Sequence, residues 1–194
     1  MKLLSAARER PWTDEQLVRE CRDGSQVAWS ALIDKYKNLI FSIPIKFGLP
    51  REDAADIFQT VCAELLVGLP QLREPKALPK WLMQTTYHQC LRWKKSKITT
   101  ADAGLDLKPD AEADGRELPE EMLYQVEREQ SVREAITGLS PRCRRMVEML
   151  FFEDPPRPYL EVARELKLAV GSIGFIRGMC LKKLRVRLEA KRFI

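Results

Sequence analysis

The sequence predicts an all-α protein of two small helical domains joined by a flexible acidic linker. Apolar residues recur every three or four positions in each long segment, which is the period of an amphipathic helix. No segment alternates apolar and polar residues in the way that predicts a strand. Residues 98–121 are acidic and poor in apolar side chains, so this stretch cannot bury a core of its own. We therefore expect domains at 1–97 and 122–194.

The charge of the chain is unevenly distributed. The formal net charge is +5 over 194 residues. Residues 98–121 contain eight acidic and two basic side chains, a net charge of −6, which leaves +11 on the two flanks. A basic balance of this kind favours a polyanionic partner, although many proteins without such a partner are equally basic.

Composition also indicates the class of protein. The five cysteines form no close pairs in the sequence, and we expect them to be free thiols in a reducing cytoplasm. One histidine and no Cys-x-x-C spacing leave too few ligands for a metal site. No cofactor or catalytic motif occurs, so we do not expect an enzyme. No apolar run resembles a signal peptide or a membrane span.

The N-terminal domain is expected to open with two helices. Thr13 is the expected N-cap of the first, and Gln16 completes its capping box. The second helix covers about 25–47. Pro44 is expected to kink or end this second helix, because proline lacks the backbone N–H that a helix interior needs.

A third helix follows in the segment REDAADIFQTVCAELLVGL. Its apolar residues from Ala54 to Leu66 form one stripe, which is expected to face the core. The opposite face is acidic and is either solvated or directed at a protein partner. This polar face contains Asp53, Asp56, Gln59 and Thr60.

A loop with three prolines, LPQLREPKALP, leads into a fourth helix from near Lys80 to about Lys97. Trp81 and Leu82 are expected in the core. Aromatic and basic residues then alternate, which suits unstacked bases because rings stack on bases while cations contact phosphates. Core packing and complementation of the helix dipole explain the same pattern. Its members are Tyr87, Arg92, Trp93, Lys94, Lys95 and Lys97.

The C-terminal domain is expected to contain four helices. One covers 123–137, and a second starts at Pro141 behind the N-cap Ser140. A short helix at 159–166, a turn and a longer helix at 172–188 have helix-turn-helix spacing. An ordinary helical hairpin that caps an all-α core explains this spacing equally well.

The last helix has an unusual outward face. Gly171, Gly174 and Gly178 lie in or near its first turns, although a glycine in a helix interior costs about 1 kcal/mol relative to alanine. We expect them to permit close approach to DNA or to the neighbouring helix. Leu181 is expected to face inward. The outward face contains Ser172, Phe175, Met179, Lys182 and Lys183.

Taken in order, these segments resemble the bacterial RNA polymerase sigma factors of the extracytoplasmic-function type. The stretch at 28–66 is similar to region two of that family, and its residues 53–59 match the acidic D-A-x-D-x-x-Q signature. Trp81 and Leu82 match the W-L pair that follows. LSPRCRRMVEML, YLEVARELKL and VGSIGFIRGMCLKKLR resemble the leader, first helix and recognition helix of region four.

The resemblance implies partners for each part of the chain. Core RNA polymerase would be bound through the clamp helices of its largest subunit, by Asp53, Asp56, Gln59 and Thr60. The flap region of polymerase and an anti-sigma factor are further partners of such proteins. The acidic linker would pass through the RNA channel of polymerase. The resemblance thus implies a cytoplasmic initiation factor without cofactor, enzymatic activity or membrane insertion.

The resemblance also implies two contacts with promoter DNA. The loop before the fourth helix, with the start of that helix, would hold a flipped base of the minus-ten element. Asparagine is common in the family after the W-L-x-x-I-A pattern, where this chain has Thr85, Thr86, Tyr87 and His88, a departure that bears on strand opening. Residues implied at the minus-ten element are Arg73, Lys76, Lys80, Gln84, Tyr87, His88, Arg92, Lys94 and Lys95. Those implied at the minus-thirty-five element are Ser172, Phe175, Met179, Lys182 and Lys183.

Two other functions fit the same sequence. One is a stand-alone helix-turn-helix regulator that binds duplex DNA, with the N-terminal half as a sensor or dimerisation domain. The other is an all-α interaction or adaptor protein that docks through the acidic face of the helix at 51–68. Co-elution with core polymerase distinguishes both from a sigma factor.

Overall fold

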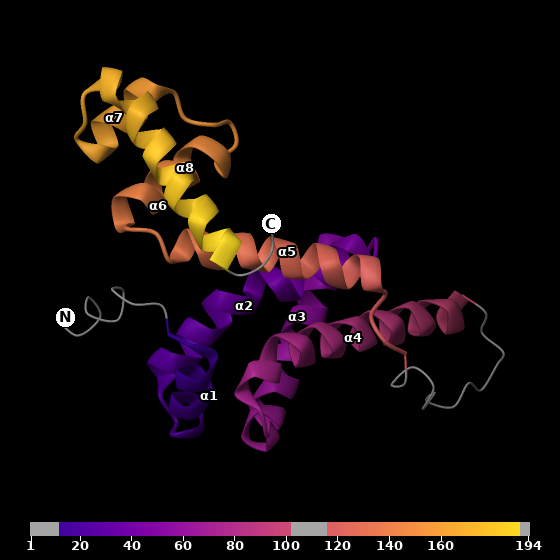
Figure 1. Ribbon diagram of the computed structural model, residues 1–194. Coiled ribbons are helices and arrows are strands. Elements are labelled where there is room, and N and C mark those ends of the chain that lie inside the picture. Colours follow the sequence, from indigo (N-terminus) through magenta and orange to yellow (C-terminus); the bar gives the residue numbers. More distant parts are fainter. Residues whose placement is uncertain (1–11, 102–115, 191–194) are drawn as a thin grey trace. The chain divides into compact units, whose positions relative to one another are not determined.

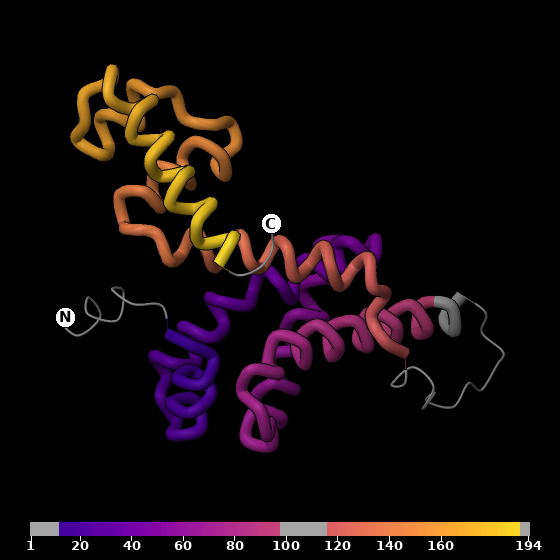
Figure 2. The backbone as a smooth tube through the Cα atoms, viewed as in Figure 1, coloured from indigo at the N-terminus to yellow at the C-terminus, as the bar shows by residue number. Residues whose placement is uncertain are grey.

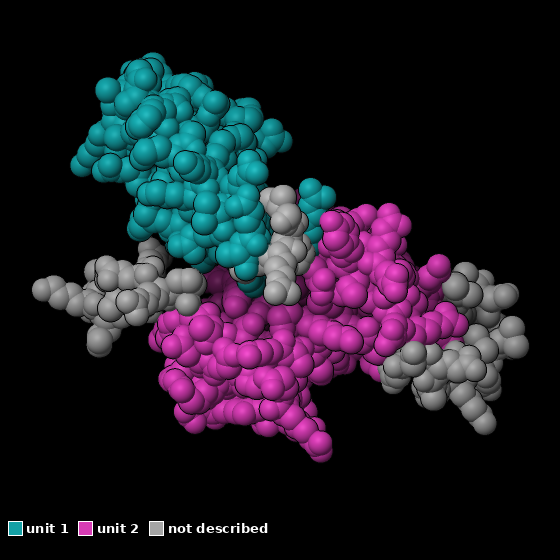
Figure 3. All heavy atoms as spheres, in the orientation of Figure 1, with its two compact units in different colours: residues 1–11, 128–194 teal, residues 12–127 magenta. Residues whose placement is uncertain are grey.

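The computed structural model describes residues 12–101 and 116–190, and all regular elements in these ranges are helical (Figure 1). The chain divides into two compact units (Figure 3). Of the described residues, those up to Glu127 form the N-terminal unit and those from Arg128 form the C-terminal unit. The predicted all-α fold class is confirmed.

The N-terminal unit contains four long helices and two short 3-10 turns. The first helix begins as predicted, because Thr13 Oγ1 accepts a hydrogen bond from the Gln16 backbone and Gln16 Oε1 accepts one from the Thr13 backbone. The elements are α1 (Asp14–Arg22), α2 (Gln26–Lys46), α3 (Arg51–Gly68), η2 (Leu69–Gln71), η3 (Pro75–Ala77) and α4 (Leu78–Ala101).

Helix α2 continues through Pro44 and ends at Lys46. Pro44 lies in the last turn of the helix, so its missing N–H removes one hydrogen bond near an end that frays in any case. Gly48 then takes the left-handed conformation, with φ of +88°, and redirects the chain toward α3.

The core of the N-terminal unit lies between α1, α2, α3 and α4. Tyr36 is fully buried, and its hydroxyl donates to Asp14 Oδ1 at 2.6 Å, which satisfies the one polar atom of its ring. The Trp81 ring packs against the same core, as predicted. A Cβ at Gly68 would lie 2.9 Å from Trp81 Cζ2, so the glycine lets this ring lie directly on α3.

Helix α5 (Glu120–Thr137) contributes residues to both units, and the division lies between Glu127 and Arg128. Leu118 is only 7% exposed and belongs to the N-terminal core, as does Val126. The sequence pattern assigned the first of these to the acidic linker and the second to the second domain. Apolar side chains at Leu118, Met122 and Val126 recur every four residues, and this stripe packs on the N-terminal core.

The C-terminal unit continues with α6 (Pro141–Phe151), α7 (Tyr159–Leu166), the 3-10 turn η5 (Val170–Ser172) and α8 (Ile173–Ala190). The backbone trace shows α7, a tight turn and α8 in the expected helix-turn-helix order (Figure 2). Lys167 ends α7 in the left-handed conformation with φ of 55°. Val162 and Ile173 are buried in a core to which α6 contributes Met146 and Val147.

A disulfide joins Cys143 on α6 to Cys180 on α8. The expectation of five free thiols is therefore wrong for this pair. The two cysteines are 37 residues apart, and only the packing of α6 against α8 brings them together. The other three cysteines are free, and burial raises the pKa of Cys21 to about 11 and of Cys90 to about 12.

Candidate protein and nucleic-acid interfaces

The polar face of α3 is an exposed surface whose composition changes along the helix. Asp56, Gln59 and Thr60 are exposed and Asp53 is half-exposed, so the structure brings all four predicted residues onto the accessible side of one helix. The Thr60 hydroxyl donates to the Asp56 carbonyl at 3.0 Å. We call the exposed residues Asp56, Gln59, Thr60, Ala63, Leu66 and Val67 the α3 stripe.

The C-terminal end of the α3 stripe is apolar. Leu66 is 57% exposed and Val67 is 71% exposed. The prediction that Leu66 faces the core is wrong, because Val61 and Leu65 already fill the inward positions at this end of the helix. Sequence periodicity could not show that Leu66 is exposed while its neighbour Leu65 is buried. The apolar face of a helix is wide enough to include both adjacent positions.

The loop between α3 and α4 is held by α1. Arg22 Nε donates to the Leu69 carbonyl at 3.4 Å, and its Nη2 atom donates to the Leu72 carbonyl. Three cations of the minus-ten prediction project from this loop and from the first turn of α4. The exposed cations are Arg73, Lys76 and Lys80. A fixed loop with exposed cations is suited to binding phosphates.

Aromatic rings of α4 pack inward. Tyr87 is 8% exposed, and its ring meets Phe47 edge-on with 5.9 Å between the centroids. Trp93 packs partly against the core, with Lys97 Nζ 5.6 Å from its centroid. Of the two roles that the sequence left open, core packing is therefore the one that the Tyr87 ring takes. Farther along α4, Arg92 and Lys94 are exposed and Lys95 is half-exposed.

Gln84 and His88, also predicted at the minus-ten element, contact the chain itself. Gln84 Nε2 donates to the Arg116 carbonyl at 2.6 Å, and Gln84 Oε1 accepts from the Leu118 N–H at 3.2 Å. His88 Nε2 lies 3.0 Å from the same Arg116 carbonyl. No sequence signal indicated this contact, because it joins positions about thirty residues apart across the acidic stretch.

The outward face of α8 carries large exposed side chains. Phe175 is 73% exposed and Met179 is 44% exposed, beside the exposed Lys182 and Lys183. Ser172 is half-buried, and its hydroxyl donates to the Ala169 carbonyl at 2.7 Å. The five predicted residues therefore lie at the start and along the accessible side of one helix.

Glycines near the start of α8 do not pack on another helix. A Cβ at Gly171, Gly174 or Gly178 would meet no atom within 4 Å. Of the two roles that the sequence left open, close packing on the neighbouring helix is therefore wrong. Leu181 is 36% exposed instead of facing inward, because Ile173 and Cys180 occupy the buried side of α8.

An open groove of ≈ 680 Å³ runs beside the C-terminal half of α8. Leu139, Met179 and Val186 supply its apolar lining, and Lys182, Lys183 and Arg187 supply its cations. Gly138 allows the Arg187 guanidinium to approach the turn between α5 and α6, since a Cβ there would lie 2.5 Å from Arg187 Nη1.

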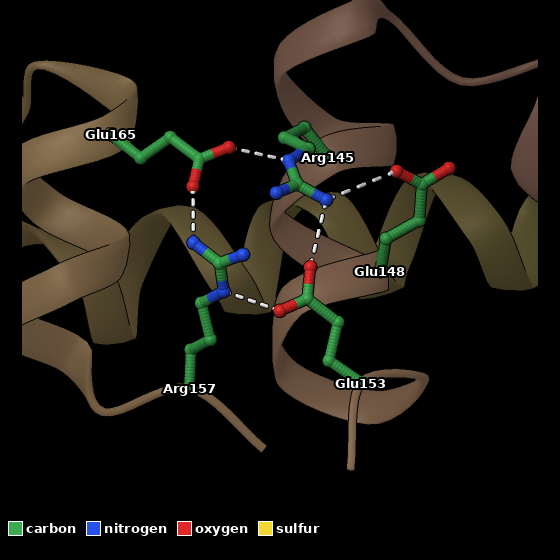
Figure 4. A network of polar contacts seen from close by, with 5 residues as sticks. All are labelled: Arg145, Glu148, Glu153, Arg157 and Glu165. Atoms are coloured by element: carbon green, nitrogen blue, oxygen red, sulfur yellow. Dashed lines mark hydrogen bonds and ion pairs between the residues drawn. The ribbon is translucent and has the colours of Figure 1, made fainter. Parts of the chain in front are cut away.

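A closed ring of ion pairs fixes α7 relative to α6 (Figure 4). Arg145 on α6 pairs with Glu165 at 2.5 Å and with Glu153 at 2.8 Å. Arg157 pairs with Glu165 at 2.6 Å and also contacts Glu153. The hydrogen bond from Arg145 lowers the pKa of Glu165. This ring therefore positions the first helix of the helix-turn-helix.

Within 12–101 and 116–190, no group of three or more His, Cys, Asp or Glu side chains could hold a metal ion. None of the helices in these ranges has the length and apolar character to cross a bilayer.

The chain is similar to a known protein over most of its length. No protein-family model matches the chain. The RNA polymerase sigma-H factor of Pseudomonas aeruginosa is 24% identical over 168 residues, which cover 82% of this chain and 86% of that protein. A match of this extent exceeds either compact unit alone. This likeness agrees with the order of motifs along the chain, which also resembles that of RNA polymerase sigma factors.

Proposed function

We propose that this protein is an RNA polymerase sigma factor of the extracytoplasmic-function type, which binds core polymerase and directs promoter recognition and the start of transcription. The likeness to a sigma-H factor over 82% of the chain carries the proposal. The helix-turn-helix order of α7 and α8 supports it. In this role the protein works in the cytoplasm and is not an enzyme.

The α3 stripe, together with the half-exposed Asp53, is the proposed docking surface for the clamp helices of the largest polymerase subunit. Asp53 and Asp56 would attract basic side chains, while Gln59 and Thr60 supply hydrogen bonds. Leu66 and Val67 extend this surface with exposed apolar area. Removing apolar area from water favours association of two proteins. The flap region and an anti-sigma factor remain proposed partners without assigned residues.

The loop cations and the second half of α4 are the proposed surface for the minus-ten element. Arg73, Lys76 and Lys80 project from the loop and the first turn of α4, while Arg92, Lys94 and Lys95 lie farther along that helix. Accessible cations of this kind are suited to contact phosphates of a DNA strand. Tyr87 is left out of this surface because its ring is buried.

The outward face of α8 is the proposed reader of the minus-thirty-five element in the major groove. Phe175 and Met179 offer apolar contacts to thymine methyl groups, whereas Lys182 and Lys183 suit phosphates. The open space at Gly174 and Gly178 lets the helix backbone approach DNA.

Co-elution with core RNA polymerase tests the proposal. We expect the full chain to elute with core polymerase in a stoichiometric complex. Binding of the chain to duplex promoter DNA without polymerase, together with no complex, would instead favour the stand-alone regulator. If neither complex forms, the adaptor function becomes the better account.

A further inference from the structure

The contacts of Gln84 and His88 form a compact arrangement on one side of α4. The Gln84 amide uses both of its ends, since Oε1 accepts from the Leu118 N–H at 3.2 Å and Nε2 donates to the Arg116 carbonyl at 2.6 Å. His88 Nε2 lies 3.0 Å from that carbonyl and 2.8 Å from Gln84 Nε2. The orientation of the amide is thus set by a backbone donor on one side and a backbone acceptor on the other.

The held segment leads directly into the N-terminal core. Leu118 is 7% exposed, and α5 follows it from Glu120. Gln84 lies 17 positions before the end of α4 at Ala101, about 25 Å along a helix axis. The end of the acidic stretch, at Arg116–Leu118, is therefore anchored back beside the first half of α4. The described residues on both sides of 102–115 belong to the N-terminal unit.

We propose that Gln84 and His88 are positioning residues that clasp the chain at Arg116–Leu118 onto α4, and that they serve this purpose instead of reading bases of the minus-ten element. An amide that reads an adenine must present its oxygen and its nitrogen together. Both atoms of Gln84 are already bonded to the backbone. The first half of this inference is independent of the proposed function, and the second half rests on it.

The sequence offers a direct probe of the clasp in the free protein. Lys108 and Arg116 are the only basic residues between 98 and 127, and Lys108 precedes a proline, which blocks trypsin. Cleavage after Arg116 therefore reports how often the clasp opens. The Leu118 amide proton gives a second report through hydrogen exchange, because Gln84 accepts its hydrogen bond.

We expect the wild-type protein to protect both the Arg116–Glu117 bond and the Leu118 amide. Gln84→Ala and His88→Ala should each speed cleavage at Arg116 by about fivefold, and the double variant should do so more strongly. Gln89→Ala is the matched control, since this amide lies on the same helix but donates to Glu64 at 2.5 Å. It should leave cleavage at Arg116 unchanged. Circular dichroism verifies that each variant is folded.

Transcription from a promoter library with a randomised minus-ten element tests the second half. The clasp predicts that both variants change activity by the same factor on every sequence. Unchanged cleavage with an altered base preference would overturn the inference and return both residues to the DNA interface. An unprotected Leu118 amide and rapid cleavage in wild type would overturn it without any variant. If core polymerase does not bind the chain, the proposed function fails, while cleavage and exchange still decide the clasp.

Discussion

Trp81 owes its position to a residue on the facing helix. Its ring lies where a Cβ at Gly68 would come within 2.9 Å, and it packs on the core of the N-terminal unit. Trp81→Ala should lower the free energy of unfolding of this unit by about 3 kcal/mol, because a large contact area is lost and the site cannot fully collapse. Thermal and urea unfolding measure this loss. Trp81→Phe keeps a ring at the site and should lose less of the free energy of unfolding. Equal stability of Trp81→Ala and wild type would refute this packing role.

Asp56 begins the α3 stripe, and Asp53 lies one turn before it on the same helix, so both carry negative charge at this end of the surface. Replacing both with arginine should weaken binding to core polymerase at least about tenfold, because reversal turns attraction into repulsion. The fold should persist, since Asp56 is exposed and Asp53 is half-exposed. Asp34→Arg, at an exposed position on α2 outside the stripe, is the control. Equal loss of binding in both proteins would indicate an unspecific charge effect.

At the scale of elements, the disulfide ties α8 to α6. Cys143 and Cys180 close a loop with a sequence separation of 37 residues, which in the chain-entropy description stabilises the unit by about 4 kcal/mol. Adding a thiol reductant should therefore lower the melting temperature of the C-terminal unit. Calorimetry with and without reductant measures the shift. Cys62→Ser should retain it and Cys143→Ser should abolish it, whereas an unchanged melting temperature in wild type would contradict the stabilising role.

Helix α8 supports a separate prediction about specificity. Phe175→Ala should scarcely change stability, because the ring is 73% exposed. It should cost about 1–3 kcal/mol on the preferred minus-thirty-five element and relax discrimination at one or two positions. Lys183→Ala should weaken all sequences alike and reduce the salt dependence. Transcription from a randomised upstream element compares the two. Uniform loss with Phe175→Ala would show that this ring is not a base reader.

Local signals predicted the helix boundaries well. The capping box at Thr13 and the proline loop before α4 are properties of a few adjacent residues, and both appear in the structure. Which side chains of a helix point into the core was harder to predict. Leu66 is exposed and Tyr87 is buried because the neighbouring helices determine which side of a helix they cover. The periodicity of one helix contains no information about these neighbours.

At the scale of the whole molecule, contacts between distant segments were beyond the sequence pattern. The disulfide and the contact of Gln84 with Arg116 join residues that only the packed fold brings together. From its composition, the acidic stretch was expected to be the linker between two domains. The described residues on both sides of it belong to the N-terminal unit, and the chain passes into the C-terminal unit within α5. Composition located this stretch but could not show where its ends are anchored.

Promoter-specific initiation is the measurement that tests the central claim most directly. Core RNA polymerase is combined with the full chain and a library of promoter fragments, and the 5′ ends of the transcripts are sequenced. A sigma factor should produce discrete start sites preceded by shared minus-ten and minus-thirty-five elements, and these starts should disappear when the chain is omitted. Identical start sites with and without the chain, in reactions where core polymerase is active, would contradict the assignment.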